Sequence, residues 1–200
     1  DALAEFKVFN LIRARLSEEG DKLDLSNLGI GDVECKCIAE CEDLKDLTHL
    51  YLELNKITGK GMAHLAGSEY LKNVTLLSLD RNKIGDEGFI SIVKSKGLQN
   101  IQVLMVENAG ITDEGIEALC EEECMTNLLR LYIEENATTE EGFELLAEPE
   151  HLQQLEYPEF DREEEIEEEE EEEEEFEDVE DIEEIEEEED LDDETEYEKA

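Results

Sequence analysis

Four acidic side chains recur at one fixed spacing along the chain and have the clearest potential for chemistry: Glu53, Asp80, Glu107 and Glu134. Two carboxylates act as general acid and base when a partly dry site raises one pKa and leaves the other normal. We expect these four side chains on an open, solvated surface, where no such difference arises. We therefore predict no catalytic residues. A row of carboxylates favours the binding of a cationic partner instead.

Three closely spaced cysteines, Cys35, Cys37 and Cys41, form a second candidate cluster. The paired C-x-x-C spacing of structural zinc sites is absent from them. Cys35 and Cys120 also stand at repeat positions that hold apolar residues elsewhere in the chain. We interpret these thiols as core residues and predict no metal site.

The remaining motifs do not support catalysis or a cofactor. His49, His64 and His151 align with no serine, cysteine or acidic partner. The sequence has no Walker or G-x-G-x-x-G phosphate loop. The GDEG and TDEG strings lack the residue order of calcium loops, and we interpret them as strand-to-helix turns. We predict a non-enzymatic protein without cofactors.

The charge of the chain limits its partners. The 200 residues include 62 acidic and 16 basic side chains, a net charge of −46, which argues against direct binding of nucleic acid phosphates. No apolar run is long enough to cross a bilayer and no signal peptide is visible, so no membrane span is predicted. The five cysteines, mostly at expected core positions, favour an intracellular location, in the nucleus, the cytoplasm or both.

The last part of the chain has a composition of its own. Residues 163–200 contain 28 acidic residues and one lysine, which predicts a disordered or partly helical acidic tail outside any packed core. One interpretation is a solubilising tail. The other is a partner-binding segment, because apolar anchors in an acidic run bury surface while the acids steer binding. The anchors are Phe176, Val179, Ile182, Ile185 and Tyr197.

An internal repeat organises about residues 20–157. Its period is 27 residues, the separation between Leu23 and Leu50 (50 − 23 = 27). Each unit has two leucine-type positions, then an asparagine, a glycine and further apolar positions. The first apolar column is Leu23, Leu50, Leu77, Leu104 and Leu131, and the second is Leu25, Leu52, Leu79, Val106 and Ile133.

This pattern, L-x-x-L-x-L-x-x-N-x-I, resembles the leucine-rich repeat family, and NKIGDEGF and AGITDEGIEAL look most like its long-repeat subfamily. That subfamily includes ribonuclease inhibitor and the Ran GTPase-activating proteins. The resemblance implies an α/β solenoid, a horseshoe with a parallel concave sheet and outer helices. Stacking of neighbouring units is required because one strand and one helix cannot bury their apolar faces alone.

The two ends of the solenoid need caps. Residues 1–19 are predicted to form an N-terminal cap helix, and residues 20–162 five repeats with a C-terminal cap. Pro158 stands where the next strand leucine is due, so the sheet is expected to stop there. The stretch LQQLEYPEFDREEE resembles the C-terminal cap of the acidic leucine-rich nuclear phosphoproteins. The apolar residues whose helical spacing suits this cap helix are Leu3, Phe6, Val8, Phe9, Ile12 and Leu16.

The asparagine column is predicted to hydrogen-bond to buried backbone groups in each turn. Leu28 and Ala109 replace asparagine in two repeats, so those turns are expected to be looser or to use Asn108. Thr58 and Thr112 are expected to cap the outer helices.

The concave sheet is the predicted partner face, because strand alternation exposes the residues between the leucine columns. The alternative is that the face is acidic only because the whole chain is acidic. The residues predicted to bind the partner are Tyr51, Glu53, Leu54, Asp80, Arg81, Met105, Glu107, Asn108, Tyr132, Glu134 and Glu135.

Three functions remain open from the sequence. The first is a module that binds a basic protein, most concretely a histone chaperone or regulator, as the resemblance to the acidic nuclear phosphoproteins implies. The second is a regulator of a small GTPase, as the resemblance to the Ran GTPase-activating proteins implies, although nothing marks Arg81 as an arginine finger. The third is a structural subunit of a large assembly.

Overall fold

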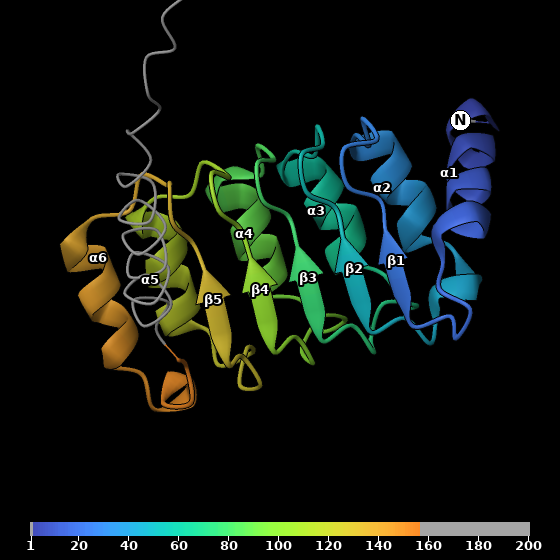
Figure 1. Ribbon diagram of the computed structural model, residues 1–200. Coiled ribbons are helices and arrows are strands. Elements are labelled where there is room, and N and C mark those ends of the chain that lie inside the picture. Colours follow the sequence, from blue (N-terminus) through green and yellow to red (C-terminus); the bar gives the residue numbers. More distant parts are fainter. Residues whose placement is uncertain (1, 157–200) are drawn as a thin grey trace, which may run out of the picture. The chain divides into compact units, whose positions relative to one another are not determined.

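The computed structural model describes residues 2–156, so the predicted acidic tail, its five anchors and the predicted stop at Pro158 lie outside the described residues. Five short strands form one parallel sheet in chain order, and the helices lie on one side of it (Figure 1). The strands are β1 (Lys22–Asp24), β2 (His49–Tyr51), β3 (Leu76–Ser78), β4 (Val103–Met105) and β5 (Arg130–Tyr132).

The helices alternate with the strands. They are α1 (Ala2–Arg15), α2 (Asp32–Ala39), α3 (Gly59–Ala66), α4 (Gly85–Val93), α5 (Asp113–Glu121) and α6 (Glu140–Glu144), with single 3-10 turns at Glu42–Leu44, Leu145–Ala147 and Glu150–Leu152. Each strand pairs with the next at an offset of one repeat, for example Leu23 with Leu50 and Leu50 with Leu77. The predicted α/β solenoid is confirmed.

The core lies between the sheet and the helix layer. Both leucine-type columns of the strands are at most 2% exposed, and the apolar column of the helices is buried with them. Since each repeat contributes the same positions, the core is continuous from one repeat to the next. The helix column is Ile38, Leu65, Ile92, Leu119 and Leu146.

The predicted asparagine bonds are present. Asn55 Oδ1 accepts from the backbone N–H groups of Leu28 (3.1 Å) and Ile30 (2.9 Å), and its Nδ2 donates to the Leu25 and Leu52 carbonyls. Asn82 and Asn136 form the equivalent links between their repeats. The suggestion that Asn108 substitutes for the missing asparagine is wrong, because its Nδ2 donates to the Glu135 carboxylate instead.

A second ladder, which the sequence did not reveal, joins the starts of the helices. Asp86 accepts hydrogen bonds from the Thr112 N–H (2.9 Å), the Thr112 hydroxyl (2.8 Å) and the Gly115 N–H (3.1 Å). Thr112 also caps α5, as Thr58 caps α3, which confirms the predicted caps. The other aspartate links of this kind are Asp32 to Thr58 and Asp113 to Thr139.

Between α3 and α4 this ladder is replaced by close backbone packing. The aspartate position is Gly59 and the threonine position is Gly85, whose φ of 60° suits glycine. A Cβ added to Gly88 would lie 3.2 Å from the Gly59 Cα and 2.7 Å from the Ile84 Cβ. Here glycines let the helices approach where other repeats use an aspartate bridge.

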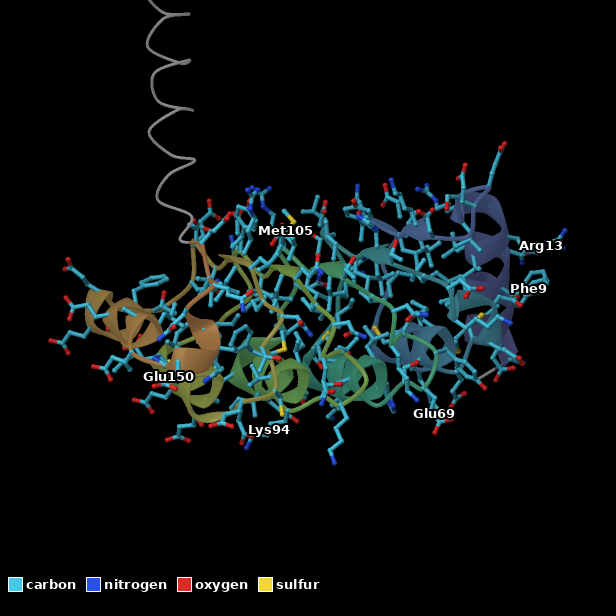
Figure 2. The ribbon with its side chains drawn as sticks, turned by 90° about the horizontal axis from the view of Figure 1, so that it is seen from below. Phe9, Arg13, Glu69, Lys94, Met105 and Glu150 are labelled. Atoms are coloured by element: carbon cyan, nitrogen blue, oxygen red, sulfur yellow. The ribbon has the colours of Figure 1, made fainter. Side chains whose placement is uncertain are left out.

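The predicted N-terminal helix is present, but only part of its apolar set is buried. Val8 and Ile12 are buried with Ala4, but Leu3, Phe6 and Phe9 are exposed. Figure 2 shows Phe9 and Arg13 on the side of α1 that faces away from the other helices. Ala4, Val8 and Ile12 recur every four residues and therefore form one narrow stripe along the helix, and this stripe is buried. The full apolar set extends around more of the helix, so its other members Leu3, Phe6 and Phe9 are exposed.

Candidate partner-binding face

Each carboxylate of the concave face is the second residue after the end of a strand, where the sheet hydrogen bonds still continue. Leu54 N–H donates to the Asp80 carbonyl and Arg81 N–H to the Glu107 carbonyl, both beyond the strand ends. Met105, at the end of β4, lies on the opposite side of the molecule from Glu69 and Lys94 of the helix side (Figure 2). The sheet thus brings the four predicted carboxylates into one column on a face separate from the helices.

The third predicted column is not a continuation of the strands. Its five residues adopt left-handed backbone with φ between 47° and 56°, which is uncommon for residues other than glycine. Strand alternation therefore ends at the carboxylates, and the chain turns away at the next residue. This column is exposed and consists of Asn27, Leu54, Arg81, Asn108 and Glu135.

Asp80 is the centre of the carboxylate column. Its side chain accepts a hydrogen bond from the Glu107 N–H (2.8 Å), while the Ser78 hydroxyl donates to Glu53 (2.8 Å). Burial raises the pKa of Asp80, and the charges of Glu53 and Glu134 add to the rise against the hydrogen bond from Glu107. The ionised form of Asp80 is therefore disfavoured in the folded protein.

Glu107 shows the same effect. Burial raises its pKa, followed by the charges of Asp80 and Glu134 and by a side-chain hydrogen bond with Glu134. All four carboxylates of the column are half-buried, so the expectation of a fully solvated surface is wrong. The turn after each strand holds these side chains against their neighbours, where a nearby cation would relieve their repulsion.

The predicted apolar contacts surround this column. Tyr51, Met105 and Tyr132 are half-buried at the strand ends, while Leu54 and Arg81 are exposed at the turn. The face therefore combines negative charge with aromatic and aliphatic surface, as protein interfaces commonly do.

One concave column was missed. The first residues of the strands share the exposed side with the last, which strand alternation already implies. His49 lies beside Tyr51, with ring centroids 6.4 Å apart, and Arg130 bonds to Glu156 at 3.0 Å. The full column is Lys22, His49, Leu76, Val103 and Arg130.

The cysteines lie in α2 and α5 or just after these helices, and not on the concave face. Cys35 is fully buried and burial raises the pKa of its thiol, while the Cys120 thiol contacts the Leu145 carbonyl at 3.4 Å. All five cysteines are free thiols. Within residues 2–156 no group of three or more histidine, cysteine or acidic side chains is arranged to hold a metal ion.

The comparisons with known proteins support the repeat fold. A family model described as Leucine Rich repeat matches residues 44–66, 70–93 and 97–120. These matches and the parallel sheet with its outer helices show a leucine-rich repeat fold. Such domains generally mediate protein–protein interaction and are generally not enzymes. No curated protein matches the chain. In the part of the chain that the structure describes, no helix is long and apolar enough to cross a membrane.

Three solved structures are similar to this chain. A leucine-rich repeat protein of Leptospira interrogans is 28% identical over 60% of this chain and 27% of its own, with a TM-score of 0.40. An internalin of Listeria monocytogenes is 20% identical over 61% of this chain and 36% of its own, with a TM-score of 0.39. Leiomodin-1 Actin-Binding Site 2 is 16% identical over 85% of this chain and 95% of its own, with a TM-score of 0.45. The chain thus spans well under half of the first two.

Proposed function

We propose that this leucine-rich repeat protein is a non-enzymatic module that binds a basic segment of another protein on its concave face. The observation that carries the proposal is the half-buried carboxylate column with the raised pKa values of Asp80 and Glu107. A lysine or arginine side chain placed against this column lowers the repulsion, and Tyr51, Met105 and Tyr132 supply apolar contact.

The distribution of charge supports this face over general acidity. Residues 47–100 carry seven basic and five acidic side chains, so the two central repeats are not acidic overall. Even so, two of those five acids, Glu53 and Asp80, occupy the concave column. The column keeps its carboxylates although basic side chains outnumber acidic ones in these repeats, which argues for a specific role.

A histone-like protein is the most concrete partner. The charge of residues 163–200 suits a lysine- and arginine-rich protein, with Phe176 and Tyr197 as anchors in the same segment. The protein would then act as a histone chaperone or regulator in the nucleus or cytoplasm, similar to the acidic leucine-rich nuclear phosphoproteins. Five free cysteines are compatible with that intracellular location.

The test compares two variants of the full chain in binding to purified core histones. Glu53→Gln/Asp80→Asn/Glu107→Gln removes three concave charges, and Glu87→Gln/Glu114→Gln/Glu117→Gln removes three exposed charges from α4 and α5. We expect a loss of at least about tenfold in affinity for the concave variant and a small change for the helix variant. Equal losses would leave only nonspecific attraction and reject the concave site.

A third variant tests the tail. Phe176→Ala/Tyr197→Ala keeps every charge and removes the two aromatic anchors, so histone affinity at moderate salt falls if the anchors bind. If histones do not bind and a small GTPase does, the regulator hypothesis replaces this proposal. If the chain is recovered only within a stable complex, a structural subunit is favoured.

A further inference from the structure

A groove on the helix side of the molecule has the opposite charge character from the concave face. It has a volume of about 610 Å³ and runs across the C-terminal ends of α3 and α4. Lys72, Lys94 and Lys96 line it, with Glu69 as the one acidic side chain among its lining residues. In a chain of net charge −46, this local surplus of positive charge needs an explanation.

The groove continues into a second hollow. The neighbouring hollow has a volume of about 390 Å³ and is lined by Lys36, Glu40, His64 and Tyr70. The two share the floor residues Ala63, Gly67, Ser68 and Glu69. Together they form one extended depression over α2, α3 and α4, on the side of the molecule where Figure 2 shows Glu69 and Lys94.

The floor of the groove is built and internally satisfied. The Ser95 hydroxyl donates to the Ala66 carbonyl and accepts from the N–H groups of Gly97 and Leu98 at 3.1 Å. A Cβ added to Gly97 would lie 2.7 Å from the Ser68 carbonyl oxygen, so glycine is needed for the close packing there. Small residues thus pack closely in the floor of the groove, and the longer lysine side chains line it as well.

The fold requires only part of this positive charge. Lys94 stands at the C-cap of α4, where a cation interacts favourably with the helix dipole, and it bonds to Glu122 at 3.2 Å. The ion pairs within residues 2–156 include neither Lys72 nor Lys96. Both lysines are exposed and lie beyond the helix ends. Their charges are available to a ligand.

We propose that this groove binds an extended acidic peptide segment of a partner protein. The lysines would pair with successive carboxylates, while Tyr70 and the aliphatic parts of the lysine side chains cover the peptide backbone. Nucleic acid fits less well, because a duplex carries its negative charges more densely than an extended acidic peptide does and is repelled more strongly by a chain of net charge −46. This surface is independent of the concave face and would let the protein contact two partners.

The test uses a fluorescent decaglutamate peptide and the full chain at about 0.15 M salt, where charges more than ~8 Å away are screened. Lys72→Glu/Lys96→Glu reverses the groove charge. Lys56→Glu/Lys83→Glu makes the same charge change in the same two repeats, on exposed lysines that do not line the groove. Circular dichroism first checks that both variants fold.

We expect the groove variant to lose at least about tenfold in affinity and the control to lose less than about threefold. No binding to the unchanged chain, or equal losses in both variants, would overturn the proposal. A parallel titration with a single-stranded oligonucleotide addresses the other ligand class. Tighter binding of the oligonucleotide, lost in the groove variant alone, would make the groove a nucleic-acid site and also overturn the proposal.

Discussion

The two central repeats and the two repeats that follow share one fold but differ sharply in charge. Residues 47–100 have a net charge of +2, whereas residues 101–154 contain one basic and fourteen acidic side chains, a net charge of −13. Both regions place the same leucine-type positions in the core, whereas the asparagine position is buried only in the central repeats, at Asn55 and Asn82. The fold therefore constrains the buried columns, whereas it does not determine the surface charge.

The junctions between helices differ as well. From α4 onward, Asp86 and Asp113 bridge to the threonines of the next repeat, whereas α3 and α4 of the central repeats pack through glycines. The aspartate and the threonine are absent together at the central junction, because Gly85 adopts a left-handed backbone that threonine does not favour. The following predictions test how far these differences matter.

The largest effect is expected from the buried asparagines. Asn82→Ala leaves the Ile57 N–H and the Leu52 and Leu79 carbonyls without their partner in a buried turn, at a cost of about 3–5 kcal/mol in unfolding free energy. Asn136→Ala removes equivalent bonds from a half-exposed turn that water can reach, at a cost of about 1–2 kcal/mol. Urea unfolding measures both. Equal costs would show that burial does not separate the two regions.

A smaller effect is expected at the glycine junction. Gly88→Ala forces a methyl group against Ile84 and the Gly59 backbone and should cost about 1–3 kcal/mol. Gly142→Ala places the methyl group against the Asp113 side chain, which can rotate away, so a smaller cost is expected. Thermal unfolding of both variants provides the comparison. A larger loss for Gly142→Ala would contradict the proposed difference between the junctions.

A stabilising change is expected in the concave column. Asp80→Asn/Glu107→Gln removes two carboxylates whose pKa values are raised, and should add about 0.5–1 kcal/mol at pH 7. Where a folded pKa is raised, the folded state binds more protons than the unfolded state, so these groups reduce stability as pH rises above their ordinary pKa values. The gain measured by urea unfolding should therefore shrink as the pH is lowered from 7 toward the ordinary carboxyl pKa values. Glu87→Gln on α4 is the control, and a gain that is independent of pH would contradict the assignment.

The smallest effect is expected at the ion pair that joins the two regions. Glu122→Gln breaks the bond to Lys94, and both side chains are well exposed. The change in unfolding free energy should stay within about 0.5 kcal/mol. A loss above about 1 kcal/mol would mean that the charge contrast between the regions helps to hold the fold together.

Much of this structure follows from the sequence. The repeated columns predicted the strands, their register, the core and the asparagine bonds, because these positions recur in every unit. The aspartate ladder was missed because Asp86 and Thr112 belong to different repeats and only stacking brings them together. The exposure of Phe6 and Phe9 was missed because an apolar pattern does not show which side of a terminal helix has a neighbour.

The concave site was predictable in part. Strand alternation placed Glu53, Asp80, Glu107 and Glu134 on one face, since a period of two applies up to the strand end. It did not predict the left-handed turn at Leu54 and its equivalents, or the half-burial of the acids. These depend on backbone geometry beyond the strands, for which Asn27 and Asn108 carry a weak signal and Leu54, Arg81 and Glu135 carry none.

The central claim is that the concave carboxylates receive a cationic side chain from a partner. The most direct measurement is a pH titration of the Asp80 and Glu107 carboxyl carbons by NMR, with and without a saturating lysine-rich histone-tail peptide. The pKa values of both groups should be raised in the free protein and should fall when the peptide binds, because a nearby cation favours the ionised forms. Saturation of the chain with no change in either pKa would contradict the concave site.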